Sequence, residues 1–165
     1  GLIQGTDGNL YGTTYGGGTK VGGTAFKVTT AGKLTTLYNF CEQANCTDGA
    51  NPFGALLQST NGTFYGATSD GGADGLGAVF SVATGLGPFV ETLPTSGKVA
   101  STVIILGNGL TGTTSVTFNG TTAAFAVVSS TEISTTVPTG ATTGTVAVTT
   151  PSGTLKSNVT FRVTK

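Results

Sequence analysis

Histidine, methionine and tryptophan are absent from this chain, and only two cysteines occur. Histidine is the commonest side chain in acid–base catalysis and a frequent metal ligand. Without it, neither a Ser-His-Asp nor a Cys-His arrangement can be built. The same shortage argues against a zinc site, which normally uses cysteine and histidine ligands. We therefore expect a protein that is not an enzyme and that holds no metal or other cofactor.

Charged residues are also scarce, at 8% of the chain against about 25% in a typical soluble domain. The numbers of basic and acidic residues are equal, so the formal net charge is zero. No cluster of Lys or Arg occurs. Because nucleic-acid binding needs a basic face that neutralises phosphates, we expect no nucleic-acid partner.

The few carboxylates favour turns over chemistry. Asp7 and Asp48 each precede a glycine, a setting in which Asp is common because it closes turns. Glycoside hydrolysis needs two carboxylates that flank one cleft, and no such pairing is indicated. Asp70 and Asp74 could offer oxygens to a calcium ion, but their spacing matches no calcium-binding loop. A solvated loop is the favoured interpretation of this pair.

Long apolar runs are missing as well. The run at residues 103–106 stops after four residues, whereas a membrane-spanning helix needs about 20. No stretch resembles a signal peptide. We expect no membrane insertion by this segment, and the lack of methionine suggests a processed product or a fragment of a longer protein.

The two cysteines, Cys41 and Cys46, lie five positions apart. With no second pair and no histidine, a local disulfide that closes a short loop is favoured over free thiols. Such a bond would indicate an oxidising compartment outside the cytoplasm. We therefore expect an extracellular or cell-surface protein.

Glycine and threonine are abundant, with 28 and 35 residues respectively. Threonine favours pleated strands, and glycine adopts the positive φ angles that tight turns require. This composition predicts an all-β protein built from many short strands.

One stretch of the sequence occurs twice. Residues 7–18 (DGNLYGTTYGGG) return without a gap as residues 61–72 (NGTFYGATSDGG). The offset of 54 residues relates Tyr11 to Tyr65 and extends from Leu2 to Val82. Self-similarity at such a period indicates repeated supersecondary units.

The alternation of apolar and polar residues between turn signals predicts strands in both copies. The first copy should form a four-stranded antiparallel unit, with strands at residues 2–4, 10–14, 24–28 and 34–40. Residues 41–53 should form a connector that carries the cysteines. The second copy should have strands near residues 55–58, 63–68 and 78–82, without a fourth strand.

The repeated aromatic residues have two interpretations. Tyr11, Tyr15, Phe64 and Tyr65 could form a platform on which sugar rings stack. Tyr11 and Tyr65 recur in register with glycines, so packing within the repeats is the favoured role for these two. Tyr15 is not repeated and is the better candidate for contact with a ligand.

With these motifs in view, residues 1–87 resemble the GloVer-type tandem repeats of large secreted or surface-anchored bacterial proteins. The resemblance rests on residues 10–18 (LYGTTYGGG) and 25–28 (AFKV), with their counterparts in the second copy. It implies two units similar to β-propeller blades, at about residues 1–53 and 54–87, the second of them incomplete.

Residues 88–165 resemble an IPT/TIG domain, which implies an immunoglobulin-like β-sandwich. The resemblance rests on residues 88–90 (PFV), 103–110 (VIILGNGL), 116–120 (VTFNG), 144–153 (GTVAVTTPSG) and 161–163 (FRV). Alternation within this segment independently predicts a set of core residues. They are Val116, Phe118, Phe125, Val127, Ile133, Val137, Val146, Val148, Val159, Phe161 and Val163.

Two blades do not close a propeller, which typically needs 4 to 8. Open sheet edges recruit further strands, so we expect completion by further blades of a longer polypeptide or by another chain. An interface that does not close would produce a filament. The expected function is a non-enzymatic extracellular structural or adhesive protein that self-associates. The alternative is a carbohydrate-binding accessory region of a secreted polysaccharide-active protein, with Tyr15, Asp70 and Asp74 as possible ligand or interface residues.

Overall fold

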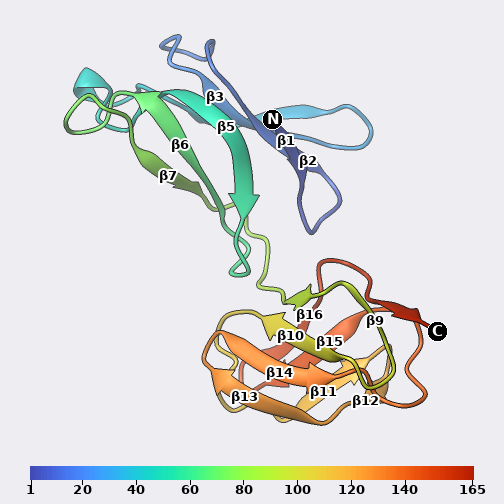
Figure 1. Ribbon diagram of the computed structural model, residues 1–165. Coiled ribbons are helices and arrows are strands. Elements are labelled where there is room, and N and C mark those ends of the chain that lie inside the picture. The colour runs from blue at the N-terminus through green and yellow to red at the C-terminus, as the bar shows by residue number, and fades with distance from the viewer. The chain divides into compact units, whose positions relative to one another are not determined.

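The computed structural model describes residues 1–165 and is all-β, with several antiparallel sheets, none of them closed. Its one helical element is a short 3-10 turn, η1 (Ala44–Cys46). The chain forms two compact units, Gly1–Leu86 and Gly87–Lys165, which Figure 1 colours from blue to light green and from there to red. The structure contains no helix with the length and hydrophobicity needed to cross a bilayer.

The first copy of the repeat forms one four-stranded antiparallel sheet. Its strands follow each other in chain order: β1 (Leu2–Gln4), β2 (Leu10–Thr14), β3 (Thr24–Val28) and β4 (Leu34–Asn39). All four confirm the predicted strands, the last ending one residue early. The Asp7-Gly8 turn joins the first two strands, and Gly8 has φ 79° there, the positive φ that favours glycine.

The second copy forms a three-stranded sheet of β5 (Ala50–Gln58), β6 (Phe64–Asp70) and β7 (Val79–Val82). The predicted lack of a fourth strand is confirmed. The predicted connector is too long, however, because β5 begins at Ala50, which pairs with Asp70. Asn51 and Pro52 resemble turn residues in sequence, yet the ladder to β6 continues through Pro52. This is tolerated because β5 is an edge strand, where a missing N–H costs little.

The two copies match in side-chain detail as well as in sequence. A methyl group added at Gly12 would lie 2.7 Å from Cδ2 of Leu2 and 3.1 Å from Cζ of Phe26. At Gly66 the same methyl group would lie 2.9 Å from Cδ2 of Leu56 and 2.5 Å from Cζ of Phe80. Each glycine therefore leaves room for a leucine and a phenylalanine that cross over its strand.

The sheets of the two copies share one core. The ring of Tyr11 from β2 stacks on the ring of Phe64 from β6, with centroids 4.1 Å apart. Tyr11, Leu56 and Phe64 are buried, and partly buried apolar residues surround them. Those residues are Ile3, Leu37, Phe80, Val82 and Leu86.

The second unit contains two four-stranded sheets and a small parallel pair. One sheet has the order β13 (Phe125–Ser129), β14 (Glu132–Thr136), β10 (Thr102–Leu106), β8 (Glu91–Leu93). The other has the order β12 (Thr121–Thr122), β11 (Ser115–Phe118), β15 (Val146–Thr150), β16 (Gly153–Lys156). Strand β17 (Arg162–Thr164) pairs in parallel with β9 (Ser96–Lys98).

One buried cluster joins the two larger sheets of this unit. Of the predicted core residues, seven are buried: Val116, Phe118, Ile133, Val137, Val146, Val148 and Phe161. Phe125 and Val163 pack partly against the cluster. The prediction is wrong for Val127 and Val159, which are exposed. Val127 lies on the edge strand β13, where the register shifts, and Val159 lies outside any strand.

Candidate functional site

The predicted disulfide between Cys41 and Cys46 is confirmed. It closes the loop that contains η1, directly after β4. The carbonyl of Cys46 accepts hydrogen bonds from the N–H groups of Gly49 and Gly72, each at 2.9 Å. Since Gly72 belongs to the second copy, the disulfide loop fastens the two sheets of the first unit to each other.

Asp48 organises the same loop, a role that was not predicted from the sequence. Its carboxylate accepts hydrogen bonds from the Tyr38 hydroxyl at 2.7 Å and from the N–H groups of Glu42 and Gln43 at 3.0 and 3.2 Å. Partial burial raises the pKa of Asp48, but these hydrogen bonds outweigh it and lower the pKa below its usual value. The hydrogen bond to Asp48 raises the pKa of Tyr38 to about 12. The only sequence signal was the Asp-Gly pair.

A second polar group surrounds Asp7, at the turn before β2. Its carboxylate accepts hydrogen bonds from Lys27 Nζ at 2.8 Å, Tyr11 Oη at 2.9 Å and Asn9 Nδ2 at 2.7 Å. Burial raises the pKa of Asp7, yet the three donors hold it well below its ordinary range. The same carboxylate raises the pKa of Lys27.

The second copy closes the corresponding turn without charge. Asn61 replaces Asp7, and its Nδ2 donates to Tyr65 Oη at 3.3 Å while its Oδ1 accepts from Thr63 N at 2.9 Å. Both groups thus hold a turn against the following strand, which is a structural arrangement common to the two repeats.

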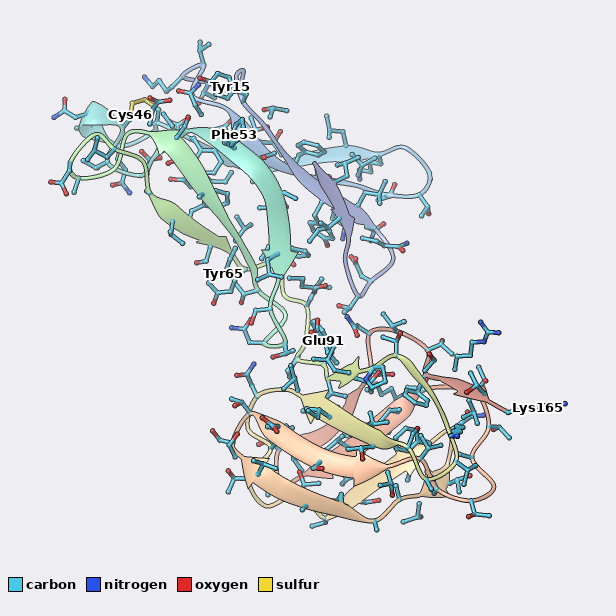
Figure 2. All side chains as sticks on the ribbon, viewed as in Figure 1. Tyr15, Cys46, Phe53, Tyr65, Glu91 and Lys165 are labelled. Carbon is cyan, nitrogen blue, oxygen red and sulfur yellow. A yellow bond between two sulfur atoms is a disulfide. The ribbon has the colours of Figure 1, made fainter.

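The structure places the predicted ligand residues at one end of the first unit. Tyr15 follows β2, and its side chain is 59% exposed. Figure 2 shows Tyr15, Cys46 and Phe53 toward this end and Tyr65 toward the other end of the second sheet. Binding of a ligand by Tyr15 stays a prediction.

Asp70 ends β6, where its carboxylate accepts a hydrogen bond from Ser69 Oγ at 2.8 Å. Asp74 lies exposed in the following loop. No group of three or more His, Cys, Asp or Glu residues is placed where it could hold a metal ion. A part for Asp70 and Asp74 at an interface also stays a prediction.

The largest contrast between the copies lies in the burial of equivalent side chains. Tyr11 is fully buried, as predicted. The equivalent Tyr65 is only partly buried, and the buried aromatic residue of the second copy is its neighbour Phe64. Ala25 is fully buried, whereas Val79 at the equivalent position is 82% exposed. The reason is that the second sheet covers this face of the first sheet, and within the first unit no further sheet covers the same face of the second.

That uncovered face is the candidate site. Phe53 pairs with Ala67 and Ala67 pairs with Val79, so the three side chains form one row across the sheet. Leu57 and Tyr65 form the next row on the same face. We call these five residues the open face: Phe53, Leu57, Tyr65, Ala67 and Val79. Three of them, Phe53, Leu57 and Val79, are well exposed, and a shallow depression of about 250 Å³ lies beside Ala67 and Val79.

The repeat seen in sequence and in structure corresponds to a known family. The model of the Gloeobacter/Verrucomicrobia repeat matches residues 1–147. The chain belongs to the Gloeobacter/Verrucomicrobia repeat family. The match extends beyond residue 87, the predicted end of the repeats. No curated protein matches the chain.

Membership in the Gloeobacter/Verrucomicrobia repeat family agrees with the two copies offset by 54 residues. It also accounts for an apolar face on the second sheet, because each repeat in a tandem array buries a face on a neighbouring repeat. The open face is mainly apolar, as are the faces on which neighbouring repeats pack.

Proposed function

We propose that this chain is a non-enzymatic structural or adhesive protein, extracellular or at the cell surface, that self-associates. The observation that carries this proposal is the open face, where large apolar side chains are exposed on a sheet that repeats a covered one. Monomeric soluble proteins rarely leave contiguous apolar patches uncovered, and such patches usually mark interaction sites.

The finer architecture belongs to the same proposal. The two sheets of the first unit are blades of the β-propeller type, and the second unit is an immunoglobulin-like sandwich of the IPT/TIG type. The four-stranded and three-stranded meanders support the first assignment, and the single core between two larger sheets supports the second. The disulfide supports placement in an oxidising, extracytoplasmic compartment.

Light scattering over a concentration series, combined with negative-stain electron microscopy, tests the proposal. We expect the weight-average mass to rise with concentration, and filaments or large oligomers to be visible. A mass that stays at 16.2 kDa up to about millimolar concentration would contradict self-association.

A second candidate function is carbohydrate binding in a secreted polysaccharide-active protein. The observation that favours it is the exposed Tyr15 ring, since aromatic faces pack against the apolar faces of sugar rings. A glycan screen tests this candidate. Binding that disappears in Tyr15→Ala and persists in Tyr38→Phe would support it.

A further inference from the structure

The interface inside the first unit has two unlike sides. The first sheet contributes Ile3 and Tyr11, with Ala25 in the neighbouring pair of the ladder. The second sheet contributes Leu56 and Phe64, with Phe80 and Val82 packed beside them. We call the first side the tyrosine face and the second side the leucine face.

Each sheet carries both faces because the repeat copies them. The tyrosine face of the second sheet consists of Leu57, Tyr65 and Val79, each 54 positions after its counterpart, and forms most of the open face. The leucine face of the first sheet has four residues at the positions equivalent to Leu56, Phe64, Phe80 and Val82. They are Leu2, Leu10, Phe26 and Val28.

Only one face of each kind is covered within the chain. Leu56 on the covered leucine face is 5% exposed, whereas Leu2 at the equivalent position is 57% exposed. Leu57 and Val79 on the uncovered tyrosine face are likewise exposed. The other three residues of the leucine face in the first sheet, Leu10, Phe26 and Val28, are partly exposed. One chain thus presents one unpaired tyrosine face and one unpaired leucine face, the latter most exposed at Leu2.

We infer that the tyrosine face of the second sheet binds the leucine face of the first sheet in a second copy of this chain. This inference rests on the proposed self-association and names its interface. The occupant follows from the structure itself, because the chain already shows which surface covers a tyrosine face. The contact between copies repeats, with equivalent residues, the contact between the two sheets.

The residues that differ between the copies are compatible with this contact. In the contact between copies, the leucine face has Leu10 where the internal contact has the larger Phe64. The tyrosine face has Val79 where the internal contact has the smaller Ala25. These changes of volume are opposite in sign, and apolar exchanges that conserve total volume are the best tolerated. Ser81 replaces Lys27, so the copy of the tyrosine face that is left uncovered lacks the charge of the covered one.

A polar contact at the internal interface also has its counterpart. Gln58 accepts a hydrogen bond from Thr6 N at 3.0 Å and donates to Thr6 Oγ1 at 3.1 Å, which joins the two sheets. Gln4 occupies the equivalent position at the unpaired leucine face. Both glutamine side chains donate to the carbonyl of a turn glycine, Gly8 at 3.0 Å and Gly62 at 3.5 Å, so the amides have the same orientation.

The two sides of this interface are different surfaces, so the contact is heterologous. A heterologous contact joins copies head to tail, into a ring if the rotation closes and into an open filament if it does not. Blocking either face on every copy therefore stops assembly completely. In a mixture of the two blocked variants, the free leucine face of one variant can still bind the free tyrosine face of the other, which leaves one contact per pair.

The test uses two charged variants of the full chain. Val79→Asp blocks the tyrosine face and Leu2→Asp blocks the leucine face. Both positions are exposed, so we expect both variants to fold, which circular dichroism checks. Val128→Asp, at an exposed valine of strand β13, is the matched control. Burying an unpaired carboxylate should weaken the contact about 100-fold.

Sedimentation velocity should show oligomers for the wild type and for Val128→Asp, and monomers for Val79→Asp and for Leu2→Asp alone. An equimolar mixture of the two blocked variants should form dimers and nothing larger. Oligomers in both blocked variants, with the wild type also associating, would overturn this interface but leave the proposed function standing. A mixture that stays monomeric would also overturn it. A monomeric wild type would overturn both.

Discussion

Equivalent glycines in the two copies lie beneath equivalent side chains, but those side chains differ in how far they can move. A methyl group at Gly12 would meet Leu2, whose exposed side chain can shift, and the carbonyl oxygen of the exposed Gly1 at 2.9 Å. Gly66 lies beneath Leu56 and Phe80 in the shared core. We therefore expect Gly66→Ala to lower the free energy of unfolding by about 2 to 3 kcal/mol, through overpacking. Gly12→Ala should cost about 1 kcal/mol less. Urea unfolding of the two variants measures both values, and equal losses would contradict the difference in packing.

Asp7 gives the stability of the first unit a defined dependence on pH. Its pKa in the folded chain is lowered, because the hydrogen bonds from Lys27, Asn9 and Tyr11 outweigh the effect of burial. A lowered folded pKa means that the stabilisation is present above the unfolded pKa of about 4 and is lost as the pH falls below it. Asp48, whose pKa is also lowered, acts in the same direction.

We expect the free energy of unfolding to fall between about pH 5 and pH 2, and to fall less steeply in Asp7→Asn. Urea titrations at several pH values measure the two slopes. Asn61→Asp provides a control, because it introduces a carboxylate at the equivalent turn without the lysine. An Asp7→Asn slope identical to that of the wild type would show that the ion pair with Lys27 contributes nothing.

At the scale of elements, the disulfide between Cys41 and Cys46 closes a short loop between β4 and β5. Closing a loop of this size should stabilise the first unit by about 2 kcal/mol in the chain-entropy model. The hydrogen bonds to Asp48 and to the Cys46 carbonyl do not require the sulfur bond. We expect Cys41→Ser combined with Cys46→Ser to keep the fold and to lose about this amount of stability. Circular dichroism with thermal unfolding measures it, and loss of the β spectrum at 25 °C would contradict this expectation.

The elements also show how far the sequence could be read. The strands of both copies were predictable because alternation and turn glycines agree, and the repeat supplied each signal twice. The start of β5 was not, because Asn51 and Pro52 have turn propensity, and Asn51 indeed has a left-handed φ of 57°. The N–H of Asn51 donates to the Gly22 carbonyl, and Pro52 pairs with Thr68 of β6, two tertiary contacts that the local sequence does not reveal. The prediction that Val127 is a core residue failed for a similar reason, because alternation does not reveal that β13 is an edge strand.

The candidate site shows the same limit more clearly. Tyr11 and Tyr65 have equivalent sequence positions, so any argument from the sequence gives them the same environment. Their burial differs because a face is covered only where a following sheet exists. The sequence could therefore identify the residues of the open face as packing residues, but their exposure depends on tertiary structure.

At the scale of the whole molecule, the two units have separate cores. The buried cluster of the first unit is formed by residues between Ile3 and Leu86, and that of the second by residues between Val90 and Val163. Domains that each enclose a core generally fold alone. We expect residues 1–86 and 87–165, expressed separately, each to unfold cooperatively in urea.

Association should then remain with only one of the two fragments. Both unpaired faces, with Leu2 and Val79, belong to residues 1–86, so that fragment should still form oligomers and lose them in Val79→Asp. Residues 87–165 should stay monomeric at the same concentration, because their large apolar side chains are mostly enclosed in their own cluster. Light scattering on the two fragments decides the matter. If residues 87–165 formed oligomers and residues 1–86 stayed monomeric, the surface that associates would lie on the second unit, and the faces of the repeat would play no part in association.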